Sequence, residues 1–169
     1  MRWHLSHRYD VRALPLADAH YNRRKVGSPQ FVPPGRNLVL LTADASALWV
    51  TSWPFAEYTR HAWAGAWVNS LFRNERGDRD LSSELVREAV AASRAKYGDP
   101  PALGMVTFVN VAKVRSTNPG CCYLRAGFRR AGETQGGLLA FQLLPVDMPP
   151  AASALPMHDG AQLLLAGVA

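Results

Sequence analysis

The pattern of apolar and polar residues predicts a strand-rich first half of the chain. Two apolar runs, 37–42 and 47–55, flank the turn formers Asp44 and Ser46, which predicts a β-hairpin. Residues 66–73 alternate between two faces, which predicts a further strand. We expect this alternation to place Trp67, Asn69 and Leu71 on one face and Val68, Ser70 and Phe72 on the other.

The clearest helix in the sequence spans residues 80–97. Its apolar stripe recurs every three to four residues and consists of Leu81, Leu85, Val86, Ala89, Val90 and Ser93. We expect Asp80 or Ser82 to cap the start of this helix. Gly98 is expected to supply the left-handed residue that ends it.

The elements after the long helix complete a sheet. Residues 102–110 are apolar and predict a buried strand. Asn118 is expected to cap a short helix that has Pro119 at its first position and stops at Gly127. Residues 130–145 predict two short strands with a bend between them. The chain therefore has α/β character, with a mixed, mostly antiparallel sheet flanked by helices.

The two ends of the chain are less regular. Residues 1–19 fit a short strand or an irregular arm, and residues 20–36 form a loop by composition. We expect residues 1–146 to make one domain. Residues 147–169, rich in proline and alanine, are expected to form a loosely attached tail.

Length, charge and cysteine usage narrow the function classes. The chain has 169 residues and a net charge of +6, which favours nucleic acid or phosphorylated partners. It has no apolar run of membrane-spanning length and no apolar leader, so no membrane association is expected. Its two cysteines, Cys121 and Cys122, are adjacent. This usage is typical of a cytoplasmic protein in a reducing compartment.

The segment from Tyr123 to Phe128 carries a resemblance to a known fold. Gly127 stops the short helix after Tyr123, and Phe128 begins the next strand. This spacing resembles the C-terminal half of the GNAT acyltransferase fold. The resemblance implies that Tyr123 points into a cleft where two central strands part, and that its phenol donates a proton to a leaving group.

The loop before the long helix departs from the GNAT pattern. That family holds the CoA pyrophosphate in a glycine-containing loop at the helix N-terminus. Here residues 72–85 contain Gly77 alone, together with the carboxylates of Asp78 and Asp80. The expected donor is therefore an unidentified acyl or aminoacyl compound, and acetyl-CoA stays possible only if this degenerate loop still binds phosphate.

A narrower resemblance covers roughly residues 20–145. The segments "HYN" at 20–22, "FRNE" at 72–75 and "CYLRAGF" at 122–128 resemble the Mom proteins of phage Mu and their relatives. Those GNAT-like proteins convert adenine in DNA to an N6-carbamoylmethyl form that blocks restriction. The residues that match their site positions are His20, Tyr21, Arg73, Ser82 or Ser83, Asn110 and Tyr123. Asn110 stands where the family has an Asp.

The resemblance implies chemistry for these residues. The N6 amine of adenine is a poor nucleophile, so an enzyme needs an acceptor on N6–H and a donor for the leaving group. His20, Ser82, Ser83 and Asn110 are the candidates for the acceptor, and Tyr123 is the candidate donor. The resemblance also raises a bound iron, with His20, Tyr21 and Tyr123 as its candidate ligands. The residues themselves predict no metal site.

Basic residues beside aromatic residues predict a DNA partner. Arg23, Arg24 and Lys25 follow Tyr21 in the loop, and cations next to rings suit flipped or single-stranded nucleic acid. A second basic group follows Tyr123 and consists of Arg125, Arg129 and Arg130, and Arg73 lies in the "FRNE" segment. We expect both groups to converge on the mouth of the cleft.

Three functions stay open at this point. The first is a Mom-like enzyme that modifies DNA adenine. The second is a conventional N-acyltransferase that uses acyl-CoA on a small molecule or protein. The third is a non-catalytic GNAT-like module that binds nucleic acid, which Asn110 in place of Asp mildly favours.

Overall fold

The protein has an α+β fold built on one mixed seven-stranded sheet within the described residues. This computed structural model describes residues 1–32, 34–75, 79–114 and 116–157. The strands are β1 (Trp3–Ser6), β2 (Asn37–Thr42), β3 (Ala47–Ser52), β4 (Trp67–Asn74), β5 (Met105–Val109), β6 (Arg129–Glu133) and β7 (Leu139–Leu143). The helices are α1 (Leu14–Asp18), α2 (Arg79–Tyr97) and α3 (Cys121–Arg125), with short 3₁₀ turns at Ala56–Tyr58 and Pro145–Asp147.

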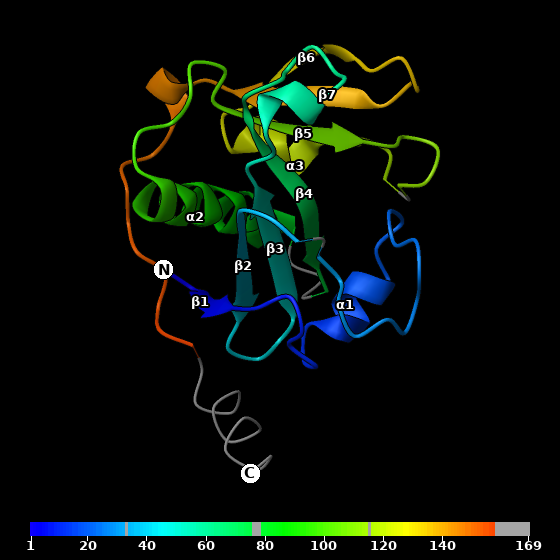
Figure 1. The fold of residues 1–169 in the computed structure, drawn as a ribbon, viewed down its shortest axis with the longest axis vertical. Helices are drawn as coiled ribbons and strands as arrows, with labels where there is room; N and C mark the ends of the chain where they lie inside the picture. Colours follow the sequence, from blue (N-terminus) through cyan, green and yellow to red (C-terminus); the bar gives the residue numbers. More distant parts are fainter. Residues whose placement is uncertain (33, 76–78, 115, 158–169) are drawn as a thin grey trace.

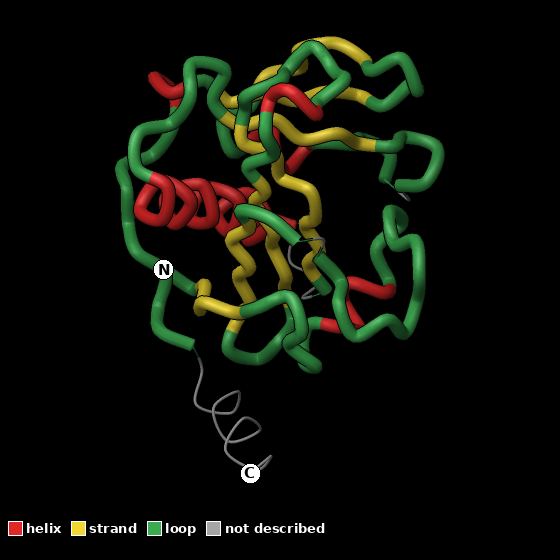
Figure 2. Tube along the Cα trace, in the orientation of Figure 1, coloured by secondary structure: helices red, strands yellow, loops and turns green. Residues whose placement is uncertain are grey.

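The strand order is β1-β2-β3-β4-β5-β7-β6, and β4 and β5 are the pair that runs parallel. The other neighbours pair antiparallel. Figure 1 shows α2 and α1 on opposite sides of the sheet, and Figure 2 shows how much of the chain between strands is loop. The predicted hairpin, the strand at 66–73 and the final pair of strands are confirmed.

Helix α2 covers one face of the sheet through the predicted stripe. Leu85, Val86, Ala89 and Val90 are fully buried and pack with Trp49 and Trp67 of the sheet. Gly98 has a φ of +82° and ends the helix, and its N–H bonds to the carbonyl of Arg94. Helix α2 begins at Arg79, so neither Asp80 nor Ser82 occupies the predicted capping position. The Ser82 Oγ instead accepts a hydrogen bond from the Asn74 side chain, at 2.8 Å.

The opposite face of the sheet has two separate covers. Leu16 and Ala17 of α1 pack with Leu48, Val50 and Leu71 over β2 to β4. A second small cluster lies over β5 and β7 and consists of Trp63, Ala66, Val106 and Ala140. These two clusters come from different parts of the chain. A pocket can form over the sheet between them.

Strand β4 contains a β-bulge. Val50 of β3 pairs with Leu71, whereas Thr51 pairs with Asn69, so Ser70 is the extra residue in the register. Trp67 therefore packs under α2, but Leu71 packs on the opposite face with α1. The expected strict alternation is wrong at this point, because a bulge reverses the side-chain direction of every residue that follows it.

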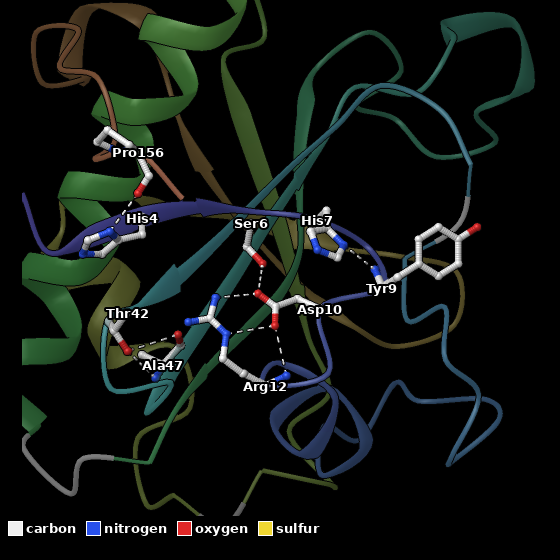
Figure 3. A network of polar contacts seen from close by, with 9 residues as sticks. All are labelled: His4, Ser6, His7, Tyr9, Asp10, Arg12, Thr42, Ala47 and Pro156. Carbon is white, nitrogen blue, oxygen red and sulfur yellow. Dashed lines mark hydrogen bonds and ion pairs between the residues drawn. The ribbon is translucent and has the colours of Figure 1, made fainter. Parts of the chain in front are cut away.

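The N-terminal arm is fixed by a buried carboxylate. Asp10 is 3% exposed and accepts hydrogen bonds from Ser6 and from the Arg12 guanidinium, as Figure 3 shows. Burial would raise the pKa of Asp10, but these hydrogen bonds outweigh it and the pKa is lowered. The turn leads directly into α1, since the N–H of Ala13 bonds to the carbonyl of Asp10.

The described start of the predicted tail is attached to the domain. Leu155 exchanges backbone hydrogen bonds with β1, and the N–H of Ala152 bonds to the carbonyl of Ala91 on α2. Arg94 also donates to the carbonyl of Pro149. The expectation of loose attachment therefore does not hold here, because extended backbone finds partners that a composition rich in proline and alanine does not reveal.

Candidate functional site

The candidate site is a pocket formed where β4 and β5 part. The two strands pair only from Trp67–Met105 to Asn69–Thr107, and the bulge at Ser70 follows immediately. Beyond this point lies a pocket of about 360 Å³ whose lining includes His20, Tyr21, Asn69, Phe72, Thr107 and Tyr123. We call it the central pocket. Its volume lies within the range typical of small-ligand sites.

A buried hydrogen-bond network centred on Asn69 forms one wall of the central pocket. The Tyr123 hydroxyl donates to Asn69 Oδ1 at 2.7 Å, and the Thr107 hydroxyl donates to the same oxygen at 3.2 Å. The Asn69 amide donates to the carbonyls of Val50 and Leu71. Each hydrogen-bonding group of the Asn69 side chain is therefore used, which fixes Tyr123 on the sheet.

Tyr123 is a neutral phenol in this position. The residue is 7% exposed, and burial raises the pKa of Tyr123 well above its ordinary value. Its proton points to Asn69, so its oxygen lone pairs are the part available to a ligand in the pocket. The expected role as proton donor conflicts with this arrangement, because donation to a leaving group would break the bond to Asn69.

The short helix α3 is held at both ends by glycine. Gly120 precedes it with a φ of +84°, and a Cβ there would lie 2.3 Å from the Phe141 ring. The expected start at Asn118 and Pro119 is therefore wrong, since the left-handed turn at Gly120 sets the first helical residue. Gly127, with a φ of +102°, ends the helix as predicted, and Phe128 is buried in the core.

His20 and Tyr21 form the opposite wall. Their rings stack with centroids 4.5 Å apart. Burial lowers the pKa of His20 to about 4, and the positive charge of Arg73 adds to this effect. The backbone N–H of Asn22 donates to His20 Nδ1 at 3.2 Å. The neutral ring therefore carries its proton on Nε2 and is a hydrogen-bond donor there, not the acceptor expected from the sequence.

Tyr21 links this wall to the end of β5. Its hydroxyl donates to the carbonyl of Phe108 at 3.3 Å and accepts from the backbone N–H of Asn110 at 3.4 Å. Burial raises the pKa of Tyr21. The Asn110 side chain accepts from the N–H of Ala112 in its own turn. Asn110 thus shapes the loop, and its side-chain oxygen already has a donor.

Arg73 on β4 connects the wall formed by His20 and Tyr21 to the sheet. It donates to the carbonyl of Ala19 at 2.8 Å and forms an ion pair with Glu75. Arg73 and Lys113 both line a cavity of about 620 Å³ next to the central pocket, together with His20 and Tyr21. Because the charge of Arg73 is paired with Glu75, Lys113 is the exposed cation that this side of the pocket offers.

The two serines predicted at the helix head lie apart from the central pocket. Ser82 lines a separate cavity of about 290 Å³, which it shares with Cys121, Cys122 and Arg125. Ser83 lines none of the cavities described here. The Ser82 cavity adjoins the central pocket, because Gly120 and Cys122 line both. The loop that would hold a CoA pyrophosphate includes residues 76–78, which lie outside the described residues.

The predicted DNA-binding residues separate into different roles. Arg23 is 10% exposed at its side chain and bonds to Asp18 and to the carbonyls of Ser28 and Gln30. It therefore stabilises the loop through its guanidinium. Arg24 and Lys25 are exposed on the same loop.

The second basic group does not converge as expected. Arg125 lines the Ser82 cavity, but Arg129 pairs with Gln142, which pairs in turn with Val106. Val106 lies where β4 and β5 are still paired, and Arg129 is on the edge strand β6, two strands away from β5, so it does not lie where the pocket opens. Arg129 contacts Asp147 instead, at 3.5 Å. The spacing along the sequence does not show this, because the chain turns at Gly127.

The residues that the resemblance suggests as iron ligands do not fit an iron ion. Both phenols are neutral with raised pKa values, and their hydroxyls donate to Asn69 and to a backbone carbonyl. His20 Nδ1 also has a donor already. Within the described parts of the chain, no three His, Cys, Asp or Glu side chains gather at one place.

Two residues of the site were missed at the sequence level. Asn69 and Thr107 are buried polar residues inside apolar strands, and a buried polar side chain requires partners. That signal was present, but the sequence does not say that the two residues face one another.

In the described residues, no helix has the length and apolar character needed to cross a bilayer.

Comparisons with other proteins do not place the chain in a family. No protein-family model, curated protein or solved structure matches the chain.

Proposed function

We propose that this protein is a GNAT-like, Mom-related transferase that attaches an acyl-derived group of the carbamoylmethyl type to N6 of adenine in DNA. The observation that carries the proposal is the central pocket at the parting of two parallel strands, with Tyr123 on its wall. The resemblance of the sequence to Mom proteins implies a cleft of this kind. Protection of phage DNA from restriction would follow from such a modification.

The walls of the central pocket suit a flat heterocycle. Tyr21 and His20 present stacked rings, and Phe72 lies on the strand across from them. An enzyme that acts on N6 has to take the base out of the duplex or use opened DNA, and such enzymes bind the base between aromatic or apolar side chains. Arg24, Lys25 and Lys113 are exposed cations on the surrounding loops and would contact phosphates.

The hydrogen-bond pattern supports a reversal of the expected catalytic roles. The Tyr123 oxygen, whose proton is held by Asn69, accepts a hydrogen bond from the N6 amine. His20 Nε2–H donates to the developing negative charge on the donor molecule. The N6–carbon bond forms as the carbon–leaving-group bond breaks. The leaving group takes that electron pair, and the proton lost from N6 passes to solvent.

Mass spectrometry of nucleosides tests this proposal directly. DNA from cells that express the chain should contain an adenosine-derived adduct that is absent from cells expressing the His20→Gln and Tyr123→Phe variants. Calorimetry with acetyl-CoA is the second measurement, and we expect no micromolar binding. Unmodified DNA together with tight acetyl-CoA binding would favour the conventional acyltransferase. Unmodified DNA with salt-sensitive DNA binding would favour the non-catalytic module.

A further inference from the structure

A second pocket lies beside the central pocket, on the face of the sheet that α2 does not cover. It has a volume of about 450 Å³, and its lining includes Arg60, His61, Trp63, Phe108, Glu133 and Leu138. We call it the His61 pocket. It belongs to no site that the sequence predicts, and none of the catalytic residues proposed above lines it.

Three aromatic rings make one wall of the His61 pocket. The centroid of the Phe108 ring is 4.9 Å from that of His61 and 5.7 Å from that of Trp63. The backbone N–H of Trp63 donates to His61 Nδ1 at 3.1 Å, which leaves the His61 proton on Nε2. Trp63 is held in place because it is 9% exposed and packs in one cluster with Ala66, Val106 and Ala140. The aromatic wall is therefore preorganised.

The two pockets share a wall that is one residue thick. Phe108 and Leu138 line both of them. The carbonyl of Phe108 accepts the Tyr21 hydroxyl on the central side, while its ring contacts His61 and Trp63 on the other side. A ligand that fills the central pocket and continues as a chain would meet the His61 pocket next.

The charges at the rim of the His61 pocket suit a phosphate chain. Arg60 is exposed there. The one carboxylate of the lining, Glu133, is paired with Arg130 at 2.8 Å. An anionic backbone would thus meet a free cation and a neutralised acid. Aromatic rings with cations beside them form the usual platform for single-stranded nucleic acid, since each base has a face that can stack.

We propose that the His61 pocket holds the base of the nucleotide adjacent to the target adenine, stacked on the His61 ring with the Phe108 ring packed at an angle of 56° beside it. This inference rests on the proposed function, because it requires that the central pocket takes an adenine from a DNA strand. It adds that the enzyme grips two consecutive nucleotides. The platform would be tolerant of sequence, with His61 Nε2–H available to an acceptor on the neighbouring base.

Short single-stranded oligonucleotides with abasic positions test the inference. Each carries one adenine and a fluorophore at its end, and the base is removed at the adenine, at its 5′ neighbour or at its 3′ neighbour. Binding to the full chain is measured by anisotropy. Loss of one of the two neighbouring bases should weaken binding by about 5- to 100-fold, the range expected for one base stacked on aromatic side chains. Loss of the other neighbour should have little effect.

Variants of the pocket residues show whether the His61 pocket causes this loss of affinity. In His61→Ala and in Phe108→Leu, removal of the neighbouring base that matters in the parent chain should weaken binding by a factor that shrinks toward one-fold. Tyr58→Ala is the control, because Tyr58 is 78% exposed and lines neither pocket, and it should keep the full penalty. An equal penalty in His61→Ala, or no sensitive neighbour at all, overturns the inference while the proposed function stands. Binding that ignores removal of the adenine itself, or no binding of any strand, overturns both.

Discussion

The hydroxyl of Tyr123 on α3 donates a hydrogen bond to Asn69 Oδ1 on β4, at 2.7 Å, and this bond joins the short helix to the bulged strand. Asn69→Ala would leave the buried hydroxyl without its acceptor. We expect the free energy of unfolding to fall by about 1–3 kcal/mol, the cost of an unsatisfied buried polar group. Urea denaturation followed by circular dichroism measures it.

A double-mutant cycle identifies the source of that loss. In the Tyr123→Phe background the hydroxyl is already absent, so Asn69→Ala should cost less than it does in the parent chain. Equal costs in both backgrounds would show that Asn69 stabilises the sheet without Tyr123.

Tyr123→Phe alone should separate chemistry from stability. The hydroxyl is one of two side-chain donors to Asn69 Oδ1, and Thr107 remains, so the free energy of unfolding should change by only about 0.5–1.5 kcal/mol. Adenine modification should fall about 10²- to 10⁴-fold if the phenol aligns the amine. Quantitative nucleoside analysis gives the rate. Full modification by the Phe variant would remove Tyr123 from the mechanism.

His20 should make stability depend on pH. Its pKa is about 4 in the folded protein and near 6.5 in an unfolded chain, so the unfolded state binds more protons between these values. Stability therefore falls as the pH is lowered from about 6.5 to 4. Denaturation at a series of pH values should show a shallower fall in His20→Gln. A titration of the His20 ring near pH 6.5 by NMR would contradict the expectation.

Neighbouring basic residues in one loop should behave differently. Arg23→Ala removes a guanidinium that bonds to Asp18 and two carbonyls, and it should lower the melting temperature. Arg24→Ala and Lys25→Ala should leave it unchanged. Each should instead reduce the log–log salt slope of DNA binding by roughly 0.7 to 0.9 if it contacts one phosphate. Unchanged slopes in both exposed variants would make the loop ordinary surface.

Asp10 offers a test of how the N-terminal arm is held. Asp10→Ala removes the acceptor of Ser6 and Arg12 and should cost about 1–3 kcal/mol, as for a buried hydrogen-bonded charge. Arg130→Ala breaks an exposed pair with Glu133 and is the matched control, with an expected change below about 1 kcal/mol. Because the pKa of Asp10 is lowered, its contribution is present above the unfolded pKa and is lost as the pH falls through the folded value.

The sequence predicts the elements of this protein better than it predicts the site. The periodicity of residues 80–97 and the alternation in the strands follow from local burial, and those elements form as expected. The bulge at Ser70 does not follow from local pattern, since it depends on how β3 and β4 align. His20 is a candidate from the sequence, but its proton position depends on the backbone of Asn22. Arg23 and Arg24 are adjacent in sequence, yet only the fold determines that one faces inward.

One unpaired residue in β4 has a consequence for recognising related proteins. The central pocket begins where Ser70 adds a residue to β4 and the pairing of β4 with β5 ends, so we expect its existence to depend on the number of residues between Asn69 and Leu71 more than on their identity. Deletion of Ser70 would align β4 in continuous register and let it remain beside β5. A relative could therefore replace every side chain of the wall and keep the opening, whereas a relative one residue shorter would lose it.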